Sequence, residues 1–292
     1  MKKEAIFMMT VLFFVIAHCK SYAQEKEPAL ARVFYEFIHV NDTSQPNKHH
    51  KEEMVLYIGQ NATLFSSYAG ERAMEKIREQ VEDPGFDGNV TISGPGRSTR
   101  ESYYFRANER VLKQVYRLPP ETYTVEQEFP VLEWTMGEES KEIGGYTVQK
   151  ATTRFRGRDY SVWFTSELPF QSGPWKFQGL PGLILEVADS KGEVFFKYAG
   201  FEKVENEMIS FGLPENTIST DQEALDKLVA AVRKNPQAAM SARSGGGSSG
   251  GLVTNVGTIQ ADVSKIKSMT VRKNADLSQT SEVDNNPLEL TD

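Results

Sequence analysis

Residues 173–187 carry the most informative stretch of this chain: Gly-Pro-Trp-Lys-Phe-Gln-Gly-Leu-Pro-Gly-Leu-Ile-Leu-Glu-Val. Within it, one hexapeptide predicts a structural turn that leads into a strand: Gly179-Leu180-Pro181-Gly182-Leu183-Ile184. Proline fixes φ at the second position of a type II turn, and glycine adopts the positive φ that the third position requires. Residues 183–187 form a short apolar run bounded by turn signals, which is typical of a strand with a buried face.

Strand-like runs continue on both sides of this stretch. They are rich in aromatic and β-branched side chains and lie at residues 33–40, 54–58, 62–66, 103–105, 111–116, 146–153, 160–165 and 194–201. Several are separated only by short turn-like segments. Because parallel pairing needs long crossover connections, this pattern favours an antiparallel meander over βαβ units.

Two segments carry helix signals. Residues 71–82 repeat apolar side chains at helical spacing, and a capping box of Thr220 and Glu223 begins a second periodic segment that ends at Pro236. Helices on one face are a common way to cover an antiparallel sheet. The sequence therefore predicts a mainly β (α+β) fold, with a single curved antiparallel sheet or half-open barrel and one or two helices.

Residues 1–23 have the pattern of a secretory signal peptide. Lys2 and Lys3 supply the basic start, residues 6–17 form an apolar stretch too short to span a bilayer, and Ser21-Tyr22-Ala23 offers a cleavage site. We therefore expect an exported protein that is periplasmic, outer-membrane associated or secreted, with no transmembrane segment after cleavage. Residues 24–292 are expected to form one β-rich domain with a flexible Gly/Ser loop at 244–251.

The charge balance and the reactive side chains narrow the function. The net charge of −7 argues against nucleic acid as a partner. A Gly-x-Ser-x-Gly match at residues 246–250 lies in a low-complexity run, and the neighbouring His49 and His50 lack a third ligand at metal spacing. We therefore predict no catalytic residue, no metal site and no cofactor, and we expect both histidines to be solvated in a loop.

Aromatic and charged side chains near the hexapeptide supply the candidate binding residues. Trp163, Trp175 and Phe177 either fill the core or line an apolar cleft. Arg156 and Arg158 alternate with Arg154, so they either bind anions from one strand face or pair with acidic neighbours. Glu186 interrupts the apolar run and points either to solvent or into a concave surface.

Further motifs accompany the hexapeptide: Trp134, Ile143-Gly144-Gly145-Tyr146, Phe155-Arg156-Gly157-Arg158, Tyr160-Ser161-Val162-Trp163-Phe164-Thr165 and Asn286-Pro287-Leu288-Glu289-Leu290. Together they resemble the GLPGLI family, secreted or envelope-associated proteins of the Bacteroidota with no assigned reaction. Many members carry a cysteine where this chain has Val148, so no role of that thiol carries over.

These observations favour an exported, non-catalytic β-rich module that binds an apolar ligand or a partner protein in the cell envelope. One alternative is a hydrolase of envelope or extracellular polymers that acts through carboxylates. A purely structural surface protein is the other. Paired inward carboxylates with raised pKa values would favour the enzyme, whereas an aromatic cleft would favour binding.

Overall fold

The computed structural model describes residues 26–93, 98–205, 209–235, 256–257, 263–272 and 284–290. The predicted signal peptide at residues 1–23 and the Gly/Ser loop at 244–251 lie outside the described residues. Within the part of the chain that is described, no helix has both the length and the apolar character needed to cross a membrane.

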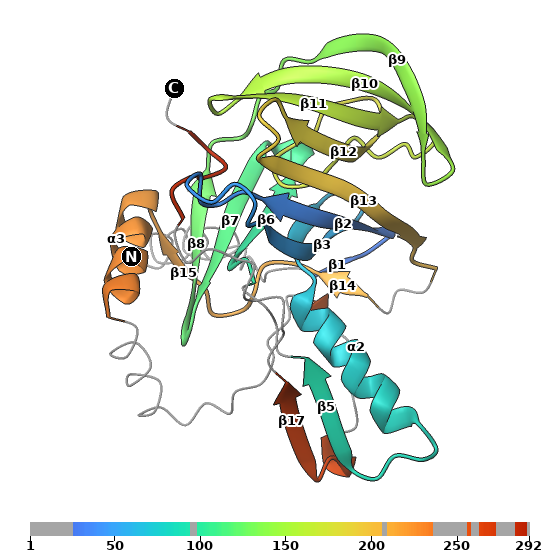
Figure 1. Ribbon diagram of the computed structural model, residues 1–292, viewed down its shortest axis with the longest axis vertical. Helices are drawn as coiled ribbons and strands as arrows, with labels where there is room; N and C mark the ends of the chain where they lie inside the picture. Colours follow the sequence, from blue (N-terminus) through green and yellow to red (C-terminus); the bar gives the residue numbers. More distant parts are fainter. Residues whose placement is uncertain are drawn as a thin grey trace, which may run out of the picture.

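One large sheet of twelve strands dominates the molecule (Figure 1). In sheet order the strands are β15 (Ile218–Thr220), β8 (Glu121–Gln127), β7 (Val111–Leu118), β6 (Glu101–Arg106), β4 (Thr63–Ser67), β3 (His50–Ile58), β2 (Ala31–His39), β13 (Val194–Lys203), β12 (Leu183–Asp189), β11 (Arg158–Thr165), β10 (Tyr146–Phe155) and β9 (Thr135–Ile143). Neighbours pair antiparallel except β15 and β8, which are parallel. The sheet is therefore mixed and open, with β15 and β9 at its edges, and the predicted mainly β fold is confirmed.

Two smaller sheets complete the strands. One contains β1 (Glu27–Pro28), β14 (Ser210–Phe211) and β16 (Val256–Gly257). The other pairs β5 (Asn89–Ser93) with β17 (Ser268–Arg272) in parallel. In Figure 1 this second pair and a helix project away from the large sheet. The prediction of a single sheet is therefore incomplete.

Two α-helices lie in the described residues, as predicted, with two short 3₁₀ segments, η1 (Ala107–Glu109) and η2 (Val263–Lys265). Helix α2 (Ala69–Glu82) buries Ile77 and Val81 against β5. Helix α3 (Gln222–Lys234) places Leu225 against side chains of β7 and β8. The predicted Thr220 cap is wrong, because Thr220 ends β15 and the Asp221 carboxylate accepts from the N–H of Ala224 at 2.7 Å.

The main core joins strands that are distant in sheet order. Leu112 of β7 and Val148 of β10 belong to the same buried apolar cluster, which also contains side chains of β2, β3 and β11–β13. The buried Tyr35 hydroxyl of β2 donates to the carbonyl oxygen of Ile184 at 2.7 Å. Strands that are far apart in the sheet order, such as β7 and β10, therefore share one core. The hydrogen bond from Tyr35 fixes the beginning of β12, which follows the hexapeptide turn, against this core.

The hexapeptide forms a tighter turn than predicted. The N–H of Gly182 donates to the carbonyl oxygen of Leu180 at 2.8 Å, the three-residue pattern of a γ-turn centred on Pro181. Because the N–H of Leu183 pairs with Leu168 instead, the prediction of a type II turn is wrong. Gly182 has φ +153°, and a Cβ atom there would lie 2.0 Å from the carbonyl oxygen of Thr165. Glycine is required here by the close approach of that backbone.

Candidate functional site

Two of the predicted binding aromatics lie in the core. Trp175 and Phe177 are 2% and 1% exposed. The Trp175 ring contacts Phe155 edge to face with centroids 5.6 Å apart, and Phe177 meets Tyr160 in the same way at 4.8 Å. Core filling, one of the two alternatives that the sequence left open, therefore describes both rings, and they do not form an apolar cleft together.

Trp163 and Glu186 lie on the outer face of the sheet. They form a cross-strand pair between β11 and β12, while Val162 and Phe164 point into the core, as strand alternation dictates. Lys141 Nζ lies 4.5 Å from the centroid of the Trp163 ring and 2.6 Å from Glu186 Oε2. This partly exposed cluster is separated from Trp175 by the sheet itself.

The three arginines do not share a strand face. Arg154 is near the end of β10, Arg156 has φ +47° in the hairpin turn, and Arg158 begins β11. The anion-binding stripe is therefore wrong, because the turn sends the three side chains in different directions. Arg154 pairs with Asp159 at 3.0 Å, and Arg156 lies 3.5 Å from a carboxylate oxygen of Glu289.

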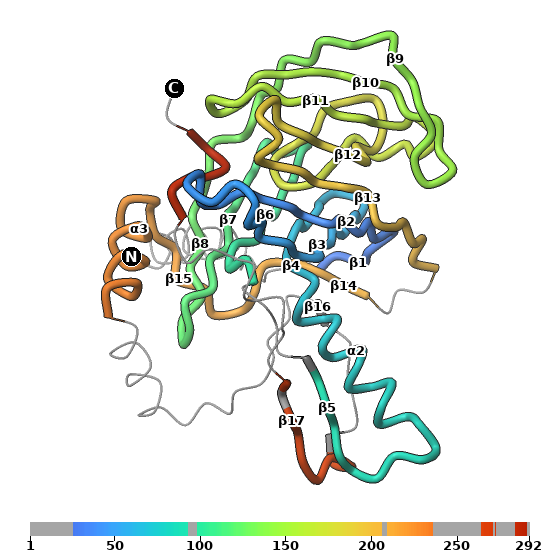
Figure 2. Tube along the Cα trace, in the orientation of Figure 1, coloured from blue at the N-terminus to red at the C-terminus, as the bar shows by residue number. Residues whose placement is uncertain are grey.

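Arg158 instead holds a buried polar network. Its Nη1 donates to Asp189 Oδ2 at 2.8 Å and to Glu193 Oε2 at 2.9 Å, while its Nη2 donates to Asn286 and to the carbonyl oxygen of Pro287. The amide of Asn286 in turn donates to the carbonyl oxygen of Val40 at 2.7 Å. Figure 2 shows residues 284–290, drawn in red, beside the blue loop that follows β2. Arg158 thus connects the sheet to residues 284–290 through hydrogen bonds.

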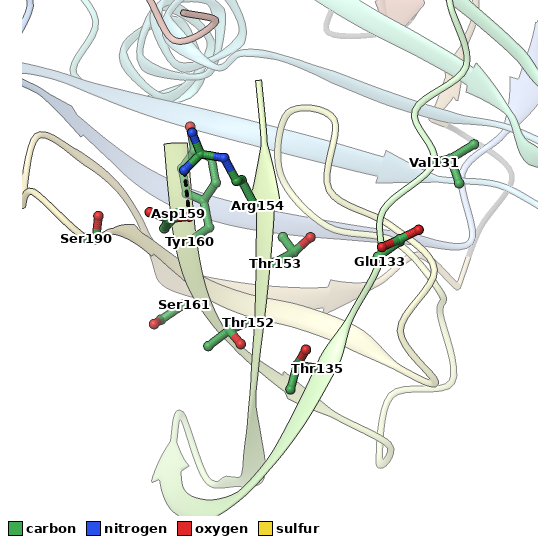
Figure 3. Close-up of a pocket in the computed structure, with 10 residues that line it drawn as sticks. All are labelled: Val131, Glu133, Thr135, Thr152, Thr153, Arg154, Asp159, Tyr160, Ser161 and Ser190. Atoms are coloured by element: carbon green, nitrogen blue, oxygen red, sulfur yellow. Dashed lines mark hydrogen bonds and ion pairs between the residues drawn. The ribbon is translucent and has the colours of Figure 1, made fainter. Parts of the chain in front are cut away.

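An open groove of about 710 Å³ lies over β9–β11 (Figure 3). Its described lining includes Thr135, Thr152 and Ser161, and the Arg154–Asp159 ion pair closes one side. None of Trp163, Trp175, Phe177, Arg156, Arg158 and Glu186 is part of this described lining. The groove exposes hydroxyl groups but brings together no set of side chains with evident chemistry.

A second cavity, of about 870 Å³, lies where β2, β3 and β6 meet α3 and residues 284–290. We call it the end cavity. Its walls include the rings of Phe37, Tyr103, Tyr116 and Trp175, and the polar groups of His39, His50, Glu101, Gln114, Gln127, Asp284 and Glu289. Of the predicted site residues, Trp175 alone is part of the described lining of this cavity.

Two histidines stand side by side in its wall. His39 and His50 are directly opposed in the β2–β3 ladder, and both are 7% exposed. Phe37 stacks on His39 with centroids 5.8 Å apart and meets His50 at 6.0 Å. Burial lowers the pKa of His39 to about 4, although nearby Asp284 acts in the opposite direction. His39 is therefore neutral at pH 7.

His50 is oriented by a carboxylate. Its Nε2 lies 3.1 Å from Glu52 Oε2, and Thr99 donates to Glu52 from both its N–H and its hydroxyl. Burial alone would raise the pKa of Glu52, but the hydrogen bonds from His50 and Thr99 outweigh it and lower the pKa. The Glu52 carboxylate can accept a hydrogen bond from His50 Nε2–H, and Nδ1 is then the ring nitrogen without a partner among the described residues.

Three buried nitrogen atoms of the end cavity lack hydrogen-bond partners among the described residues. They are His39 Nε2, His50 Nδ1 and Trp175 Nε1. The Trp175 N–H lies near the Tyr103 hydroxyl without a hydrogen bond of acceptable geometry. Trp175 also has φ +54°, an uncommon conformation for a bulky residue that is often found at functional sites. Three unsatisfied groups on one cavity are a feature that packing does not explain.

Acidic groups surround the same space. Burial raises the pKa of Glu101, and the neighbouring Asp284 raises it further. Asp284 lies 3.6 Å from Arg233, and Glu289 pairs with the buried Lys176. Within the described residues, no three His, Cys, Asp or Glu side chains are arranged to hold one metal ion.

Side-chain amides form a further part of the wall. Gln127 Nε2 donates to Gln114 Oε1 at 2.9 Å and to Gln222 Oε1 at 2.8 Å, while Lys176 Nζ donates to Gln127 Oε1 at 3.3 Å. This chain of bonds connects β7, β8 and α3. The amide wall is therefore fixed in place before any ligand arrives.

Sequence reasoning missed most of this cavity. It placed His50 in a solvated loop, which is wrong, because His50 begins β3 and is buried. The alternation of buried and exposed residues in β3 continues back from Met54 to Glu52 and His50. Extending that strand pattern by two inward positions would have found both polar residues.

Comparisons with known proteins give little functional information. No curated protein matches this chain. Two crystal structures of PNGF-II, in space groups P21 and C2, are similar with TM-scores of 0.47 and 17% identity. They match 70% and 72% of this chain, which spans about a third of the PNGF-II chain (33% and 34%).

The family comparison concerns the signature itself. The model of a family described as a protein of unknown function (Porph_ging) matches residues 156–186, which include the hexapeptide. This segment of the chain therefore carries the pattern of a family of unknown function, in agreement with the predicted GLPGLI resemblance.

Proposed function

We propose that this protein is an exported, non-catalytic binding module of the cell envelope and that its ligand occupies the end cavity. We further infer that the sheet forms a half-open barrel whose opening lies beside α3 and residues 284–290. Support comes from the core that β7 and β10 share and from the position of the end cavity. The volume of about 870 Å³ falls within the usual range of ligand sites.

The single observation that carries the proposal is the set of three unsatisfied nitrogen atoms on one cavity. Leaving a buried donor or acceptor without a partner costs about 1–3 kcal/mol each. A ligand that hydrogen-bonds to His39, His50 and Trp175 would remove that penalty. The lining also presents aromatic ring faces, so the ligand we propose has both apolar and polar surface, rather than the purely apolar character expected from the sequence.

Mass spectrometry of the protein purified under native conditions from its own envelope tests the proposal. We expect a co-purifying molecule that is lost in Asp226→Trp, because Asp226 is an exposed residue of α3 that lines the cavity. Lys227→Trp is the matched control, since Lys227 is the exposed neighbour and lies outside the described lining. Equal retention in both variants, or no bound molecule in the wild type, would contradict the proposal.

A carboxylate-dependent hydrolase is the second candidate, and the raised pKa of Glu101 favours it. A carboxyl group with a raised pKa beside other carboxyl groups is the arrangement that general acid catalysis uses. Asp284 and Glu289 would then be its partners in the same cavity. Release of product from a bound polymer by the wild type, abolished in Glu101→Gln while binding is retained, would favour the enzyme over the binding module.

A further inference from the structure

We propose that the ligand of the end cavity is a neutral, polyhydroxylated molecule of the saccharide class. This inference rests on the proposed function, because it concerns the same site. It follows from the hydrogen-bonding character of the three unsatisfied nitrogen atoms, from the acidic side chains of the lining and from the rings around them.

The free atoms require a ligand that both accepts and donates hydrogen bonds. The indole Nε1 of Trp175 is a donor only, so it needs an acceptor. His50 presents the opposite requirement, because a neutral imidazole that donates from Nε2 to Glu52 has an acceptor at its unpartnered Nδ1. A hydroxyl group is donor and acceptor at once, so neighbouring hydroxyl groups on one molecule meet both needs.

The charges in the lining of this cavity are mainly acidic. The lining contains the carboxyl groups of Glu101, Asp226, Asp284 and Glu289 and the cations Arg100 and Arg233. Arg233 already lies 3.6 Å from Asp284. An anionic ligand would therefore meet more carboxyl groups than cations, whereas a neutral ligand requires no countercharge.

The rings supply a surface for the C–H faces of a sugar. Phe37 stacks on His39 and meets His50 edge on, so these three rings form one continuous wall. Tyr103 and Trp175 also line the cavity. Aromatic side chains with a polar atom at one edge suit ligands that are apolar on one face and polar around the rim.

A peptide is the competing ligand for the same space. Peptides commonly bind as an added strand at a free sheet edge, with main-chain hydrogen bonds supplying much of the affinity. Next to the cavity, residues 50–52 of β3 pair only with β2, and Glu101 and Ser102 of β6 pair only with β7. A peptide is therefore the competing outcome in the test.

Nuclear magnetic resonance of the indole N–H groups gives a direct readout in the full chain. The probes are maltotetraose, cellotetraose and chitotetraose, with tetragalacturonate and tetra-alanine as the acidic and peptide comparisons. We expect at least one neutral tetrasaccharide to shift the Trp175 resonance and to leave the outer-face Trp163 resonance unchanged. Asp226→Trp should abolish the shift and Lys227→Trp should retain it.

Removal of single hydrogen bonds sharpens the assignment. Trp175→Phe should weaken binding of that tetrasaccharide about tenfold, the effect of one lost hydrogen bond. His39→Phe provides a second variant if Trp175→Phe fails to fold, and Trp163→Phe is the matched control with unchanged affinity. Equal affinity of the wild type and of every folded cavity variant would overturn the proposal.

The remaining outcomes separate the two proposals. A Trp175 shift with tetra-alanine alone would overturn the saccharide class, and a shift with tetragalacturonate alone would overturn the neutral character of the ligand; either result leaves the binding module standing. The same holds if no tetrasaccharide binds while an envelope molecule without sugar is lost in Asp226→Trp. If no probe shifts the resonance and no molecule co-purifies, both proposals fail.

Discussion

Arg158 Nη1 lies 2.8 Å from Asp189 Oδ2, and both side chains are only 1% exposed. A charged pair this deeply buried is strongly coupled to the fold, because removing one partner leaves the other charge without compensation. Asp189 is further fixed by the N–H groups of Glu193 and Val194, at 2.7 and 3.0 Å.

Arg158→Met should therefore lower the free energy of unfolding by about 3–5 kcal/mol, measured by urea denaturation. Arg154→Met is the matched control, because its pair with Asp159 is largely exposed and should contribute about 0–1 kcal/mol. If both variants unfold at the same urea concentration, the buried network does not contribute as described.

Gly182→Ala should lower the melting temperature through a loss of about 1–3 kcal/mol, because the new Cβ atom meets the backbone of Thr165. Gly145→Ala is the control for backbone strain alone, since Gly145 has φ +87° with no atom within 4 Å of the added Cβ among the described residues. The close approach would be refuted by equal losses in the two variants.

The low pKa of His39 predicts that acid weakens the fold. The folded pKa of about 4 lies below the ordinary value of 6.5, so the unfolded chain binds the proton first as the pH falls. The contribution of His39 is fully present above about pH 6.5 and declines towards pH 4, with a limit of about 3 kcal/mol. Urea unfolding at pH 4.5 and 7.5 measures this change.

His39→Phe is the variant to compare in that experiment. Its ring preserves the stacking on Phe37 but has no proton to bind, so its stability should fall less between pH 7.5 and 4.5 than that of the wild type. An identical pH dependence would show that carboxylates, and not His39, carry the acid sensitivity.

The contribution of Glu101 to stability should have the opposite pH dependence, and Glu101→Gln should remove it. Because the pKa of Glu101 is raised in the folded state, the wild type loses stability as the pH rises through that pKa. The variant, which cannot ionise, should gain stability relative to the wild type between pH 4 and 7. A constant difference across this range would contradict the buried position of the carboxyl group.

The strands and helices were largely predictable because their patterns are local. The alternation in β11, with Val162 and Phe164 inside and Trp163 outside, follows directly from the two-residue period of a strand. The parallel pairing of β15 with β8 was not predictable, since it depends on contacts between residues about 95 positions apart, such as Ile218 and Tyr123.

The end cavity could not be predicted either, because it also depends on contacts between residues far apart in the sequence. Glu101, His50 and Asp284 come from distant parts of the chain, and nothing in their neighbouring residues indicates that they meet. Trp175 was found as a candidate, with core filling and an apolar cleft as the two alternatives for its ring. Its buried position and free N–H depend on the packing of several strands, which residue spacing does not encode.

The hydrogen bond between Arg158 and Asn286 also constrains the order in which parts of the chain can reach their final contacts during folding. The two residues are 128 positions apart, so β11 cannot satisfy its guanidinium group until residues 284–290 have been synthesised and have reached it. Closing a loop of this length is slow compared with forming the β10–β11 hairpin. The hydrogen bonds of Arg158 in β11 are therefore completed only by a segment that is made much later, and a chain shortened before Asn286 would lose two of them.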